Sequence, residues 1–240
     1  MKQNILIPAL FIAGYISLLS CGDSAKNKPD MKSPEKNMPT AAKGTENTGA
    51  ASVIVDPEAK TIANMQASIK SEINTTAKYA AFSKKAVAEG YNEIAILFKA
   101  ASIAENVHAI NHKAVLAEMG VTLIPVIPEL TVTSTKENLE LAIKSETYEA
   151  EEMYPSFLKE ANSLANQIAL ISLNYAYKTE KKHKVYFENA LVALNDTKLN
   201  NLPVEYYICP TCGNTYAAIV SKRCGVSLTG GEKFIKISSL

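Results

Sequence analysis

The sequence predicts an all-α four-helix bundle with one long crossover, followed by a small β-rich C-terminal module. Apolar residues recur at steps of three and four in four long segments between residues 57 and 195, which is the spacing of one helix face. Short links join the first two segments and the last two, whereas the proline-containing stretch "VTLIPVIPELTVTST" separates the pairs. This order of links is typical of a bundle with one crossover. From residue 204 onward, cysteines and aromatic residues replace the helical pattern.

Residues 1–20 resemble a bacterial lipoprotein signal peptide. Lys2 precedes an apolar run that is too short to be a comfortable membrane span. The run ends in "LLSC", and the polar "GDS" follows Cys21. We therefore expect cleavage before Cys21 and lipidation of this cysteine, which would anchor an extracytoplasmic protein to a bacterial membrane, facing the periplasm or the cell surface. An uncleaved anchor and an ordinary secretory peptide are the alternatives.

Residues 21–55 are predicted to be a flexible tether, because a stretch with almost no large apolar side chain cannot offset its ordering entropy. The remaining chain is long enough for one domain, the bundle at 56–196, and a small module at 204–240. The net charge of +1 includes no basic block, so the sequence predicts no nucleic-acid partner.

The first two predicted helices cover residues 57–89 and 91–119. Pro57 lies in the first turn of the first helix, and Gly90 ends it. Gly120 ends the second helix. Their apolar faces consist of Ile62, Met65, Ile69, Thr76 and Tyr79, and of Ile94, Phe98, Ala101, Val115 and Met119.

The third and fourth predicted helices follow an extended connection, because the two prolines and β-branched residues of "VTLIPVIPELTVTST" disfavour a helix. The third begins near Thr135 with "TKENLE", which has the form of a capping sequence, and Pro155 should kink it or break a backbone hydrogen bond. The fourth covers about 163–195. Their apolar faces consist of Leu139, Ala142, Met153 and Phe157, and of Leu173, Ala176, Phe187, Ala190 and Leu194.

All four apolar faces carry acidic residues at mid-height. Buried negative charges at this density need positive partners, and two divalent cations would cancel four of them. Glu-x-x-His on two helices, with a Glu from each of the other two, is the di-iron carboxylate arrangement, because the i, i+3 spacing puts both side chains on adjacent turns of one face. The predicted ligands are Glu72, Glu105, His108, Glu146, Glu149, Glu180 and His183.

The two halves of the bundle resemble each other. Glu72 and Glu105 are separated by nearly the same number of residues as Glu146 and Glu180, which suggests a duplicated helical hairpin. His112 lies on the same face as the ligands but has no counterpart in the second half. We therefore expect it to support a ligand or to pack in the core rather than to bind metal.

Five segments resemble the rubrerythrin family, which are ferritin-like di-iron proteins with a rubredoxin-like tail: "SEINTTAKY", "AENVH", "ETYEAEEMYPSF", "TEKKH" and "YICPTCGNTY". "ETYE…MYP" is the most family-specific of them. The resemblance implies a ferritin-like bundle in which Glu105 and Glu180 bridge two irons. It also implies that Glu72 binds one iron, while Glu146 and His183 complete the other.

The resemblance also suggests catalytic residues. Glu149 matches an additional carboxylate that ferritins lack, and an iron is thought to move between this residue and His108 as the redox state changes. Tyr79 and Tyr154 match tyrosines that orient ligand carboxylates.

The activity implied by the resemblance is the reduction of hydrogen peroxide to water, as protection against oxidative stress. An unidentified donor would supply electrons through the tail, and no nucleophilic residue is needed because the metals provide the electrons. The family also implies a homodimer. A ferritin-like lipoprotein that sequesters iron without significant turnover is the main alternative, and a structural lipoprotein held together by metal is another. Manganese would suit the same ligands.

The tail, residues 204–240, departs from the rubredoxin-like pattern. Cys209 and Cys212 form an intact first knuckle, whereas the second retains Cys224 but has Ser227 in the place of a fourth cysteine. We expect one iron or zinc ion at the three cysteines, with Ser227 or water completing the site, and a closing strand within "EKFIKI" at 232–237. A metal-free remnant with two of the cysteines joined is the alternative.

Overall fold

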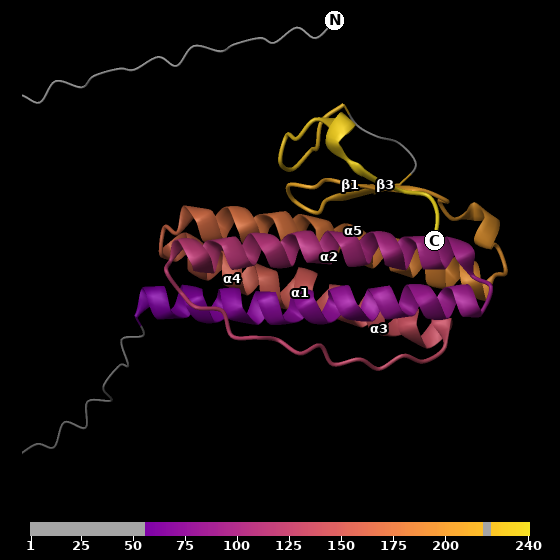
Figure 1. Ribbon diagram of the computed structural model, residues 1–240, viewed down its shortest axis with the longest axis horizontal. Coiled ribbons are helices and arrows are strands. Elements are labelled where there is room, and N and C mark those ends of the chain that lie inside the picture. Colours follow the sequence, from indigo (N-terminus) through magenta and orange to yellow (C-terminus); the bar gives the residue numbers. More distant parts are fainter. Residues whose placement is uncertain (1–55, 218–221) are drawn as a thin grey trace, which may run out of the picture. The chain divides into compact units, whose positions relative to one another are not determined.

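The computed structural model describes residues 56–217 and 222–240. The predicted signal peptide 1–20, the lipidation site Cys21 and the tether 21–55 lie outside the described residues. The described chain is mostly helical with one small sheet, which agrees with the predicted fold class (Figure 1). None of the described helices is long and apolar enough to cross a membrane. The main helices are α1 (Pro57–Ala88), α2 (Asn92–Glu118), α3 (Thr135–Tyr148), α4 (Tyr154–Ser163) and α5 (Gln167–Asn195).

The helix ends follow from local sequence. The Asp56 side chain accepts a hydrogen bond from the backbone of Glu58 and caps α1. Gly90 and Gly120, which follow α1 and α2, have φ values of +84° and +70°, a region that favours glycine. The Ser134 side chain and Glu137 form a reciprocal capping box at the start of α3.

The third predicted helix consists of three parts, because a π-helical turn at Glu149–Met153 separates α3 from α4. Within this turn the backbone N–H of Tyr154 donates to the carbonyl of Glu149. Pro155, which has no N–H to donate, lies in the first turn of α4, where it is tolerated. The backbone irregularity expected at Pro155 therefore takes the form of a π-helical turn just before it.

The fourth helix begins a few residues later than predicted. The chain leaves α4 through Ala165, whose φ is +52°, and the Asn166 side chain then accepts a hydrogen bond from the backbone of Ala169 to cap α5. Helix α5 thus begins at Gln167 rather than near residue 163.

The tail contains a three-stranded antiparallel sheet in the order β2-β1-β3. Strand β1 is Tyr206–Ile208, β2 is Thr215–Ala217 and β3 is Ile235–Ile237, so the closing strand lies within the segment that was predicted for it. In the central strand Tyr207 pairs with Tyr216 and with Lys236. Tyr206 and Ile208 belong to the same buried apolar cluster as residues of α2 and α5, so this sheet packs on the bundle.

The bundle core has two apolar clusters. One contains the aromatic rings of Tyr79, Phe98 and Phe187, with ring centroids 5.2–5.9 Å apart. The other contains Met65, Ile69, Leu116, Met153 and Leu173. Along α1, Glu72 lies between Ile69 of one cluster and Tyr79 of the other, so the acidic residues occupy the layer between two apolar ones.

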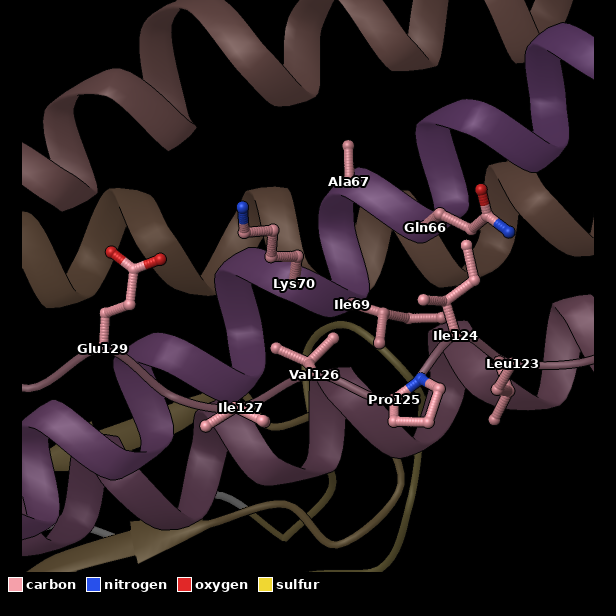
Figure 2. Close-up of a pocket in the computed structure, with 10 residues that line it drawn as sticks. All are labelled: Gln66, Ala67, Ile69, Lys70, Leu123, Ile124, Pro125, Val126, Ile127 and Glu129. Atoms are coloured by element: carbon pink, nitrogen blue, oxygen red, sulfur yellow. The ribbon is translucent and has the colours of Figure 1, made fainter.

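The connection between α2 and α3 is irregular and runs beside α1 (Figure 1). A pocket of about 530 Å³ lies between Ile69 of α1 and the segment Leu123–Glu129, and Ile124 and Val126 are among the residues that line it (Figure 2). No predicted metal ligand lines this pocket. The predicted ligands are instead buried between the helices.

Candidate metal centre

The seven predicted ligands are completely buried, and six of them converge. Their ligand atoms form two sets of four, and within each set all atoms lie within 4.8 Å of one another. Two glutamates, Glu105 and Glu180, belong to both sets. The first set is Glu72, Glu105, His108 and Glu180, and the second is Glu105, Glu146, Glu180 and His183.

His108 directs one ring nitrogen toward the carboxylates and the other toward the tail. Its Nε2 lies 3.2 Å from the carbonyl oxygen of Cys212, and since a carbonyl only accepts, Nε2 carries a hydrogen. Its Nδ1 lies 2.9 Å from Glu180 Oε1 and 3.0 Å from Glu105 Oε2. Burial alone would lower the pKa of His108, but the charge of Glu180 and the hydrogen bond with Glu105 raise it, so without metal Nδ1 can donate to these carboxylates. A cation bound between them would take the place of that proton.

His183 repeats this arrangement on α5. The hydroxyl of Thr215 donates to the carbonyl of Gly213, so it accepts from His183 Nε2, which lies 3.0 Å away. His183 Nδ1 lies 2.9 Å from Glu105 Oε1 and 3.2 Å from Glu180 Oε2. Both histidines thus present Nδ1 to the same pair of glutamates, as the ligands of a two-metal centre would.

Several buried carboxylate oxygens are left without hydrogen bonds from the described residues. Buried acceptors are normally paired, so each such oxygen needs an explanation. Metal ions would supply the missing partners, and this donor set of carboxylates and imidazoles suits iron or manganese. The oxygens are Glu72 Oε2, Glu146 Oε2, Glu149 Oε2 and both oxygens of Glu180.

The centre holds protons when it holds no metal. Burial and the nearby charge of Glu180 raise the pKa of Glu105 to about 7. Burial and the charges of Glu105 and Glu180 raise the pKa of Glu146 well above its usual range. Burial alone would lower the pKa of His183, but the charge of Glu105 and the hydrogen bond between the two side chains raise this pKa to about 9. Cations that bind here must displace these protons.

Two tyrosines orient carboxylates at the centre. Tyr79 donates to Glu146 Oε1 at 2.5 Å, and Tyr154 donates to Glu72 Oε1. His112 Nε2 lies 3.1 Å from the Tyr154 hydroxyl, and its Nδ1 lies 2.8 Å from Ser172 Oγ. His112 belongs to neither ligand set, and it contacts the tyrosine that donates to Glu72, a predicted ligand.

Sequence reasoning missed three hydroxyl residues. Ser71 donates to Glu149, Ser172 contacts His112, and Thr215 contacts His183. Serine and threonine occur on every face of a soluble helix or strand, so no pattern distinguished them.

The tail brings its three cysteines together. Their sulfur atoms lie within 4.8 Å of one another, and all three are free thiols. Ser227 Oγ is 3.2 Å from Cys209 Sγ and 2.8 Å from Thr229 Oγ1. The hydrogen bond between Cys209 and Cys212 lowers the pKa of Cys209 to about 4 and raises the pKa of Cys212, so the pair shares one proton that a metal binding both sulfurs must displace. This geometry provides three sulfur ligands with a hydroxyl beside them.

The two candidate sites are in contact through the first knuckle. Besides the hydrogen bond from His108 to Cys212, Gly213 packs so closely that a Cβ there would lie 2.3 Å from His108 Nε2. Gly213 also has a φ of +74°, which favours glycine. Glycine is therefore required for the knuckle to approach the histidine.

The chain is similar to several known proteins. Residues 63–191 match the family model described as Rubrerythrin. Nigerythrin of Nitratidesulfovibrio vulgaris is 31% identical over 72% of this chain and 85% of its own length. Rubrerythrin-2 of Clostridium acetobutylicum is 31% identical over 65% of this chain and 85% of its own length. The structure "Fully reduced state of nigerythrin (all ferrous)" has a TM-score of 0.66 and 29% identity, covering 79% of this chain and 91% of that one.

Proposed function

Because the chain belongs to the rubrerythrin family, we propose that it is a non-haem di-iron oxidoreductase that reduces hydrogen peroxide to water. The observation that carries the proposal is the orientation of His108 and His183. Each ring donates through Nε2 away from the centre and presents Nδ1 to the shared glutamates. A similar solved protein is described as all ferrous, which supports iron as the metal.

Two irons fit the six converging residues. Glu72 and His108 would hold one ion, Glu146 and His183 the other, and the remaining two glutamates would bridge them. When bound there in the reduced state, two irons would supply the two electrons needed to cleave the peroxide O–O bond, and two protons would complete two water molecules. The chain itself fixes the carboxylates through tyrosine hydrogen bonds and excludes bulk water by complete burial. Its buried glutamates would compensate the positive charge of the irons.

Electrons would enter through the tail. The hydrogen bond from His108 Nε2 to the carbonyl of Cys212 supports this route, because it joins a ligand of one candidate site directly to the backbone of a ligand of the other. An iron held by Cys209, Cys212 and Cys224, with Ser227 completing the site, would receive electrons from an unidentified donor.

Iron sequestration without significant turnover is the second candidate function. The observation that favours it is Ser227, whose hydroxyl lies where a sulfur would give a stronger iron site. A neutral hydroxyl binds ferric iron less tightly than a thiolate, which would weaken electron entry.

Steady-state peroxide consumption by iron-loaded protein with an artificial reductant separates the two functions. The parent should consume peroxide catalytically, whereas Glu180→Ala should lose both iron and activity. Glu188→Ala is the matched control, because Glu188 lies two turns further along α5 and its side chain is 45% exposed. Iron uptake without peroxide consumption by the parent would support sequestration and contradict the peroxidase.

We also propose that lipidated Cys21 anchors the protein on the extracytoplasmic side of a bacterial membrane, and that it forms a homodimer. The sequence "LLSC" supports the anchor and family membership supports the dimer. Radiolabelled palmitate should enter the parent but not Cys21→Ser. Equal labelling of both forms would contradict lipidation at this cysteine.

A further inference from the structure

Glu149 is the predicted ligand that stands apart. It is as completely buried as the others, yet in the described part of the chain it belongs to neither set of four converging ligands. The first set is completed by His108 instead. A buried carboxylate outside the metal-binding sets needs another partner to hold it there.

That partner is Ser71, which precedes Glu72 in α1. Its hydroxyl donates to Glu149 Oε1, and this is the hydrogen bond that the described structure gives the carboxylate, since Oε2 accepts none. Ser71 is fixed by the α-helical backbone, where its carbonyl accepts from the Thr75 hydroxyl. Glu149 begins the π-helical turn, so the contact joins α1 to the irregular segment of the opposite helix.

We propose that Ser71 is a positioning residue that holds Glu149 away from the ligand set around His108; this inference rests on the proposed di-iron function. A carboxylate oxygen can accept from the Ser71 hydroxyl or bind a cation, and the hydroxyl competes with the metal for it. A hydrogen bond to a charged acceptor is strong enough that losing it changes the ratio of the two positions about tenfold. Ser71 therefore sets how readily Glu149 becomes a ligand.

The reduction potential of the iron pair would depend on whether Glu149 binds iron or accepts the hydrogen bond from Ser71. An anionic carboxylate stabilises ferric iron more than ferrous iron, because its attraction grows with the charge of the ion. Freeing Glu149 should therefore lower the reduction potential of the iron pair. A tenfold change in the relative stability of the two oxidation states corresponds to about 30 mV for a two-electron couple.

The experiment compares the midpoint potentials of iron-loaded parent, Ser71→Ala, Ser71→Thr and Ser68→Ala, each followed by visible absorption during an anaerobic reductive titration. Ser68 is the matched control, because it lies one turn earlier in α1 and its buried hydroxyl has no hydrogen-bond partner among the described residues. Ser71→Ala should lower the potential by about 30 mV, corresponding to the tenfold change. Ser68→Ala should leave it unchanged, and Ser71→Thr, which retains a hydroxyl, should return it toward the parent value.

Equal potentials in the parent and Ser71→Ala would overturn the inference, as would an equal shift in Ser68→Ala. If Ser71→Ala does not fold, Ser71→Cys, which replaces the hydroxyl by a weakly donating thiol of similar size, gives the same comparison. A parent that binds iron and shows the Ser71 shift but does not reduce peroxide contradicts only the proposed function. A parent that binds no iron contradicts both.

Discussion

Removal of metal should make the stability of the bundle fall as the pH rises from about 5 to about 9. The reason is that the empty centre binds protons more tightly than the unfolded chain does. Glu105 has an ordinary pKa of 4.5, which burial and the charge of Glu180 raise to about 7 in the folded protein. Its contribution to stability is complete below pH 4.5 and is lost as the pH rises through 7.

The size of this effect follows from the same values. At about 1.4 kcal/mol per pH unit, the shift of Glu105 corresponds to ~3 kcal/mol between its unfolded and folded pKa. His183, whose pKa rises from 6.5 to about 9, loses its contribution between those values. The two side chains lie 2.9 Å apart and stabilise each other's charge, so their contributions overlap. We expect a total loss nearer ~3 kcal/mol than twice that amount.

Urea unfolding of iron-free protein, followed by circular dichroism at about pH 5, 7 and 9, measures this loss. Glu105→Gln should flatten the lower part of the profile, because the amide does not titrate. Iron-loaded protein should show little fall over the same range, since the cations compensate the carboxylates. Metal-free protein whose stability is constant or rises between about pH 5 and pH 9 would refute a buried cluster of like charges.

Further predictions concern four individual residues. Glu180→Ala should remove both metals, since this residue belongs to both ligand sets, and metal analysis checks this. Glu149→Ala should retain metal but slow the redox cycle of the iron pair, which single-turnover kinetics check. Ser227→Cys should make the tail site resistant to chelators and strengthen the absorption of ferric thiolate, and unchanged metal loss would argue against Ser227 as the fourth position. Gly213→Ala should destabilise the protein by ~2 kcal/mol, because its Cβ would meet His108 and its φ is positive. An unchanged urea concentration at the midpoint of unfolding would contradict the close contact.

The sequence indicated much of the fold and the centre because both depend on periodic patterns. Glycines ended α1 and α2 where expected, and the acidic residues of four helix faces do meet in one buried layer. Their action as ligands stays a prediction. Ala165 escaped notice because nothing local marks an alanine that adopts a positive φ.

Other features depend on contacts between distant segments. The sequence predicts only a kink or a broken hydrogen bond at Pro155 and not the π-helical turn beside it, since a proline shows that a hydrogen bond is missing but not how the backbone adjusts. The contact between His108 and Cys212 joins residues far apart in the chain, and no helix-face pattern encodes it. Ser71 was missed for a similar reason, because its hydroxyl is singled out only by its hydrogen bond to Glu149, which is distant in the sequence.

The central claim is that a reduced iron pair in the bundle reduces peroxide. Stopped-flow oxidation of the anaerobically reduced protein, by peroxide and separately by oxygen, tests it most directly. Peroxide should oxidise the centre much faster than oxygen does, with two irons bound per bundle. Oxidation by oxygen that is as fast or faster, with iron accumulating beyond two per bundle, would contradict it.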